Sequence, residues 1–198
     1  MKKIIFCITL LVISVSSISA QRSAWGLRGS YLYYTLTEKA SGMSSSNENA
    51  QGAELGVIYY GLINQNFYSN FGTMFSVMRL KGGGPNFYGY EIPFYLGVVS
   101  KGTSDFSLFA QAGIYYASWF SSNSNVTKIL KWPQIGLGAI AGFNIKKFKV
   151  EIGYKYGLTN FMSAKEGEYS IVEGGVLMDV PSFTLKLSSL SVGVSYVF

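Results

Sequence analysis

Five charged residues stand within otherwise apolar, alternating segments of the chain: Arg28, Glu54, Glu91, Glu151 and Lys155. If folding gathers them in one interior, they could form a ligand site or a conduction path. They could also fill the interior as a salt-bridge network. The sequence favours the network, because a buried charge without a partner is costly.

Histidine is absent from the chain. A serine is a weak nucleophile without an adjacent base, and histidine is the usual base in envelope hydrolases. The sequence therefore predicts no catalytic residues and a protein that is not an enzyme. Because a lysine or a carboxylate can replace histidine as a base, a lipid-modifying enzyme stays a third alternative.

Metal-binding and phosphate-binding motifs are also missing. The single cysteine, Cys7, lies in the N-terminal segment, so that only oxygen ligands are left for a metal. Acidic residues gather between 166 and 179 without the spacing of a calcium loop. The run Gly82–Gly84 has no strand-to-helix context and reads as a flexible loop. We expect no metal and no cofactor.

Residues 1–20 have the pattern of a secretory signal peptide. Lys2 and Lys3 precede an apolar stretch, Ile4 to Val15, and small residues follow up to Ala20. The apolar stretch is too short to span a membrane. We expect cleavage after Ala20 and one domain over residues 21–198.

The composition does not suit a water-exposed surface. Charged residues make up 13% of the chain and aromatic residues 16%, whereas a soluble surface carries roughly 25–35% charged residues. The basic residues are scattered, which argues against a nucleic-acid partner. Much of the surface is therefore expected to face something other than water.

Apolar residues alternate with a period of two along most of the chain, which is typical of strands. One face of each run is large and apolar, and the other is rich in glycine and serine. Small residues suit the crowded interior of a narrow barrel, so we expect the apolar face to point outward. Eight such runs cover residues 25–35, 53–61, 67–77, 90–98, 106–117, 134–143, 148–158 and 190–198.

The connections alternate in length, as in outer-membrane barrels. Short ones are expected near 63–66, 100–105 and 145–147, and long ones near 36–51, 81–87, 120–131 and 162–182. The predicted fold is an all-β, eight-stranded, antiparallel, up-and-down transmembrane β-barrel. It would cross the bacterial outer membrane repeatedly, contact outer-membrane lipid, and keep both termini in the periplasm.

Aromatic residues lie near both ends of the runs, as expected for two membrane-interface belts. The belt beside the termini comprises Trp25, Tyr59, Phe67, Phe106, Phe143, Phe148 and Phe198. The belt beside the long loops comprises Tyr33, Tyr90, Tyr116, Trp132 and Phe161.

Several segments resemble those of a known group of proteins. They are YEIPFYLG at 90–97, FAQAGIYYA at 109–117, GLGAIAGFNI at 136–145, YKYGLTNF at 154–161 and the closing SVGVSYVF. With them, residues 25–198 resemble small outer-membrane β-barrel proteins of the PorT-like and OmpA/OmpX-like kind. The EIP segment followed by YGLTN is typical of the PorT-like branch. The resemblance implies a porin-like outer-membrane barrel without a shared catalytic motif.

Two features suggest interactions with other proteins. Tyr196 and the terminal Phe198 resemble the C-terminal signal by which the barrel insertion machinery receives such proteins. The segment YSIVEGGVLMDV has two apolar arms around a hairpin-turn signal, and it departs from the resemblance. It could extend the neighbouring strands, or it could bind an envelope protein complex through Tyr169, Ile171, Val172, Val176, Leu177 and Met178.

The predicted function is therefore non-enzymatic: binding or assembly with envelope or surface partners by a barrel with a side-chain-filled lumen. The alternative is a narrow pore or a transporter for small or apolar molecules.

Overall fold

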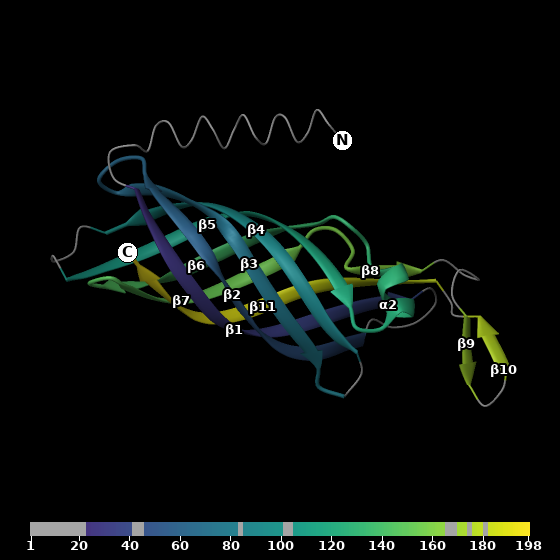
Figure 1. Cartoon of the computed structure of the whole chain (residues 1–198). Helices are drawn as coiled ribbons and strands as arrows, with labels where there is room; N and C mark the ends of the chain where they lie inside the picture. The colour runs from purple at the N-terminus through teal and green to yellow at the C-terminus, as the bar shows by residue number, and fades with distance from the viewer. Residues whose placement is uncertain are drawn as a thin grey trace.

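Eight long antiparallel strands hydrogen-bond in chain order and close into a barrel (Figure 1). The computed structural model describes residues 23–40, 46–82, 85–100, 105–164, 170–173, 176–179 and 182–198, and the predicted signal peptide lies outside them. The barrel strands are β1 (Ser23–Ala40), β2 (Ser46–Leu62), β3 (Phe67–Leu80), β4 (Asn86–Val99), β5 (Phe106–Ser121), β6 (Gln134–Ile145), β7 (Phe148–Gly157) and β11 (Phe183–Val197).

The first and last strands close the barrel. β1 pairs with β11 from Gly26↔Val197 to Ala40↔Phe183. The amide of Phe198 then donates a hydrogen bond of 2.8 Å to the carbonyl of Trp25. This closure confirms the predicted fold class and explains why the apolar C-terminal run ends as a strand.

We call the end of the barrel that holds Ser23 and Phe198 the terminal end, and the opposite end the loop end. Four short elements belong to the loop-end connections: α2 (Ser124–Ile129), β8 (Met162–Ala164), β9 (Ser170–Glu173) and β10 (Val176–Asp179). β8 pairs with β11. β9 and β10 pair with each other as a separate two-stranded sheet.

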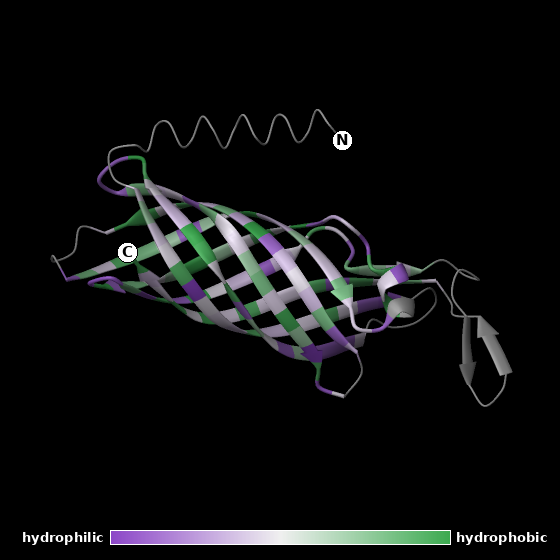
Figure 2. Cartoon of the chain, viewed as in Figure 1, coloured by the Kyte–Doolittle hydropathy of each residue, from purple (hydrophilic) through white to green (hydrophobic). Residues whose placement is uncertain are grey.

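Burial alternates residue by residue along the strands, and the same alternation is visible in hydropathy (Figure 2). On β7, for example, Ile152 and Tyr154 are exposed, while Glu151 and Lys155 are buried. The predicted outward face is therefore confirmed, since it carries large apolar residues. The inward face carries the small and polar residues, and also large side chains such as Tyr95 and Met78.

Strands β1 and β2 are longer than the sequence predicted. The expected polar connection at 36–51 is wrong, since pairs such as Leu36↔Glu48 and Glu38↔Ser46 continue the ladder. Polar side chains hide such an extension from hydropathy, because their backbone groups can still pair with each other in water. The barrel therefore projects beyond its apolar band at the loop end.

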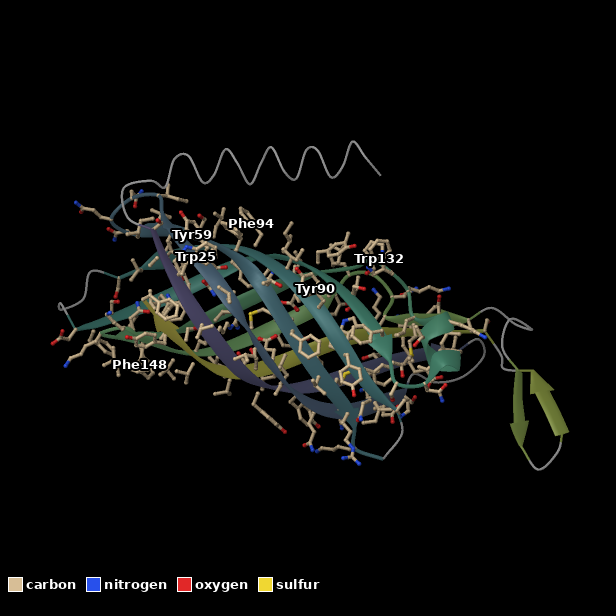
Figure 3. The ribbon with its side chains drawn as sticks, viewed as in Figure 1. Trp25, Tyr59, Tyr90, Phe94, Trp132 and Phe148 are labelled. Atoms are coloured by element: carbon tan, nitrogen blue, oxygen red, sulfur yellow. The ribbon has the colours of Figure 1, made fainter. Side chains whose placement is uncertain are left out.

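The two aromatic belts are present, with one correction. Trp25, Tyr59 and Phe148 lie near the terminal end, and Tyr90 and Trp132 lie nearer the loop end (Figure 3). Phe161, which was predicted for the second belt, is only 1% exposed and packs against Phe87 inside the barrel. It follows the end of β7, where strand alternation no longer decides which way a side chain points.

Inward aromatic rings lie over glycines of the neighbouring strand. Tyr95 of β4 is the direct partner of Gly113 of β5. A Cβ atom at Gly113 would lie 2.6 Å from Cδ1 and 2.7 Å from Cα of Tyr95. Because Cα belongs to the backbone, the ring cannot make room by rotating alone. Position 113 therefore requires glycine, because the neighbouring strand lies too close for a side chain.

We predict that Gly113→Ala destabilises the barrel, whereas Gly29→Ala does not. At Gly29, a Cβ atom would meet only Leu55 Cδ1, at 3.8 Å. Overpacking costs about 1–3 kcal/mol. Both glycines lie in strands, so the change in intrinsic strand propensity from glycine to alanine is the same for the two variants. Urea unfolding in lipid vesicles measures the difference. Equal stability of the two variants would contradict the close-approach argument.

Candidate functional site: the charged interior of the barrel

The five charged residues singled out in the sequence lie together inside the barrel. Arg28 comes from β1, Glu54 from β2, Glu91 from β4, and Glu151 and Lys155 from β7. Each is at most 5% exposed. They meet because alternation turns each side chain inward, and because closure brings β7 and β11 round to β1.

Arg28 links two carboxylates. Its Nε lies 2.5 Å from Oε1 of Glu151, and its Nη2 lies 3.7 Å from Oε1 of Glu54. The first distance is that of a close ion pair, although the two atoms do not have hydrogen-bond geometry. The second is too long for a hydrogen bond but within reach of electrostatic attraction.

Lys155 links Glu54 to Glu91. Its Nζ donates hydrogen bonds to Oε2 of Glu54 at 2.8 Å and to Oε1 of Glu91 at 2.7 Å. The five groups thus form one chain, Glu151–Arg28–Glu54–Lys155–Glu91, in which the sign of the charge alternates. In a low-dielectric interior this order matters, because an unpaired charge there is strongly unfavourable.

A plug of apolar side chains closes the barrel on the loop side of the network. Its buried members include Leu36, Met78, Phe87 and Phe161, and Val126 and Ile129 of α2 pack against it from the loop end. Trp119 joins the plug through its ring and donates a hydrogen bond from Nε1 to Gln134 at 3.0 Å. The described loop-end elements therefore help to fill the lumen.

A polar and aromatic layer lies on the terminal side of the network. Tyr68 donates a hydrogen bond to Gln111 Oε1 at 3.0 Å, and Asn70 Nδ2 donates to the same oxygen. Beyond them, Lys149 of β7 is 8% exposed. The period-two alternation of the run 148–158 puts Lys149 on the same face as Glu151 and Lys155, but the predicted network did not include it. Its place among inward residues was the signal that could have marked it.

Little space is left between these layers. A cavity of about 10 Å³ beside Glu91, Lys155 and Trp119 is about what one water molecule needs. A much larger hollow, about 670 Å³, lies on the outer wall, where small residues such as Ala112 and Ala139 replace bulky ones. Acyl chains fill such a hollow in a bilayer.

The other predicted site residues belong to the C-terminus and to the segment that contains β9 and β10. Tyr196 and Phe198 are exposed at the terminal end, with ring centroids 5.5 Å apart. Backbone pairs Leu177↔Val172 and Met178↔Ile171 form the hairpin that the sequence predicted, and Val176 pairs with Glu173. Tyr169 lies outside the described residues.

The described residues contain no group of three or more histidine, cysteine, aspartate or glutamate side chains that could hold a metal ion. No helix among them is long and apolar enough to cross a membrane.

Several known structures are similar to this chain. OprG, an outer membrane protein of Pseudomonas aeruginosa, is 14% identical with a TM-score of 0.51, over 89% of this chain and 96% of its own. Neisserial surface protein A is 12% identical with a TM-score of 0.49, over 90% of this chain and 100% of its own. Ail of Yersinia pestis is 15% identical with a TM-score of 0.41, over 87% of this chain and 98% of its own.

No family model and no curated protein matches the chain, so the PorT-like assignment stays a prediction. The likeness to OprG shows a shared fold. The position in a membrane follows from the exterior, since soluble proteins rarely expose apolar patches larger than a few hundred Å². Outward residues such as Leu55, Ile152 and Val192 are each more than half exposed. The chain is an integral outer-membrane β-barrel protein.

We predict that Lys155→Met strongly destabilises the barrel, by about 3–5 kcal/mol, because it leaves two buried carboxylates without their shared cation. Glu91→Gln should cost less, since Lys155 keeps its bond to Glu54. Lys147→Met, at an exposed turn residue, is the matched control. Urea unfolding in vesicles measures all three, and wild-type stability of Lys155→Met would contradict the network's role.

Proposed function

We propose that the protein is a non-enzymatic binding or assembly component of the outer membrane that acts through its outer surfaces rather than through its lumen. The observation that carries this proposal is the filled interior. Three layers of side chains, namely the apolar plug, the five-residue charge network and the layer around Gln111, lie one above another along the barrel axis.

The filled interior argues against a pore. Eight strands leave room only for side chains, and here the five charges of the network are engaged with one another rather than with a water column. Lys155 is bound to two carboxylates at once. An ion that entered would have to break these pairs and displace the plug.

An enzyme is also disfavoured. Without histidine in the chain, the remaining candidate bases are carboxylates and lysines. Glu54, Glu91 and Glu151 lie inside the barrel wall, at most 5% exposed, where a lipid substrate in the membrane cannot reach them. Their pairing with Arg28 and Lys155 stabilises the barrel.

The hairpin β9–β10 is the segment that we assign to partner binding. Its two strands pair with each other, and in the described structure neither pairs with a barrel strand. An unpaired strand edge can recruit another strand, which is a common mode of protein recognition. Apolar residues on both arms, among them Ile171 and Leu177, suit a protein partner in an envelope complex. Phe198, exposed at the terminal end, is our candidate for the contact with the insertion machinery.

We predict no stable conductance from the purified, folded protein in a planar bilayer. The plug and the charge network leave no continuous path, so that the current should stay at the leak level across the range of applied voltages. Heat-dependent gel mobility of the same sample verifies that the barrel is folded. Reproducible current steps from the folded fraction would instead support the pore alternative.

We predict that replacing residues 170–179 with a glycine–serine linker of equal length abolishes partner binding and leaves the barrel folded. The hairpin contributes no strand to the barrel, which is why folding should survive. Cross-linking in intact cells, followed by affinity purification of the barrel, measures the partner adducts.

The control inserts the same linker after Gly82, whose surroundings are open. This variant should keep the wild-type adducts. If the hairpin replacement also keeps them, the binding role assigned to β9–β10 is wrong.

A further inference from the structure

A pocket of about 300 Å³ lies at the terminal end of the barrel. One part of its wall is apolar and includes Leu62, Val99 and Phe106, and Lys149 also lines it. The charge network and the apolar plug lie farther along the lumen. The pocket is therefore a closed-ended recess rather than the mouth of a channel.

Lys149 is the unusual member of this pocket. The side chain is 8% exposed, and its Nζ lies 4.1 Å from the ring centroid of Phe109, 4.6 Å from that of Tyr60 and 4.9 Å from that of Tyr68. Among the described residues, no carboxylate pairs with this ammonium group, and no acceptor hydrogen-bonds to it. The nearest inward carboxylate along β7, Glu151, is engaged by Arg28.

Lys149 differs from Lys155 in its partners. Lys155 also points inward from β7 and binds two carboxylates. Among the described residues, the three hydrogen-bond donors of the Lys149 ammonium group have no acceptor, and the aromatic rings hold the group in place by cation–π attraction. An ammonium group that is held by rings, nearly buried and without an ion-pair partner among the described residues is well prepared to receive an anion, since little conformational entropy remains to be lost.

The charges around the pocket limit the kind of anion. Lys146 and Asp105 also line it, and together with Lys149 they give a net charge of +1. A monoanion matches this charge. The apolar wall matches a compact apolar body, which would remove Leu62, Val99 and Phe106 from water.

We propose that this pocket binds a small organic monoanion, a carboxylate with a compact apolar or aromatic body, whose carboxylate accepts hydrogen bonds from Lys149 Nζ. The volume suits a molecule of about ten non-hydrogen atoms. This site is independent of the binding role proposed for the loop end, because it opens at the other end of the barrel.

The test uses benzoate as the probe, with the full mature chain folded in detergent micelles. Equilibrium dialysis should show saturable binding of one benzoate per chain. Benzamide, a neutral molecule of the same shape, should bind at least about tenfold more weakly, because it loses a charge-assisted hydrogen bond. Inorganic phosphate should bind weakly as well, since it has no apolar body.

Lys149→Met should weaken benzoate binding at least about tenfold, whereas Lys147→Met, at an exposed position of the adjacent turn, should bind as the wild type does. Lys149→Arg keeps the charge and should retain part of the affinity. Heat-dependent gel mobility checks that every variant is folded.

Three results would overturn the proposal. The first is a wild-type protein without saturable benzoate binding, which would leave Lys149 as a structural filler of the barrel. The second is equal binding of benzoate by the wild type and by Lys149→Met, and the third is equal binding of benzoate and benzamide by the wild type. If Lys149→Met does not fold, the comparison of benzoate with benzamide on the wild type still decides.

Discussion

The structure depends on one constraint: in a hydrocarbon layer, every backbone N–H and C=O group must find its hydrogen-bond partner within the protein. A sheet can satisfy this only by closing, and here β1 closes onto β11 over fifteen residue pairs, from Gly26↔Val197 to Ala40↔Phe183. Closure with eight strands makes the interior narrow. From this follow the inward glycines, such as Gly113 beneath Tyr95, and the need to fill the remaining space with side chains.

Filling that space with charges is workable only when the charges alternate in sign. Arg28 and Lys155 each lie between two carboxylates, so that no two acidic groups need to face each other without a cation. Such a network ties β1, β2, β4 and β7 together across the lumen, and it restricts the pairing of strands because a shift by one residue would turn every charge into lipid. The same network occupies the path that a solute would need. The charge network thus both helps to specify the fold and fills the lumen.

Much of this could be predicted from the sequence, because period-two alternation assigns each residue of a membrane strand to one face. Arg28, Glu54, Glu91, Glu151 and Lys155 were found in this way. Where the alternation stops, the prediction fails. Phe161 follows a strand end and turns inward to the plug, and the polar pairs from Leu36↔Glu48 onward extend β1 and β2 without any hydropathy signal.

The contacts of an inward residue, unlike its face, depend on residues far away in the sequence. Lys149 and Lys155 have the same side chain, the same strand and the same face, yet one lies among aromatic rings and the other between carboxylates. Their surroundings differ because the strands that close the barrel bring Tyr60, Tyr68 and Phe109 to one level and Glu54 and Glu91 to another. At the level of Lys155 every charged group has a partner of opposite sign, and the space is filled. At the level of Lys149, no carboxylate of the described residues forms an ion pair with the positive charge, which lies beside an open recess. The terminal end, rather than the plugged loop side of the lumen, is therefore where we expect a small anion to bind.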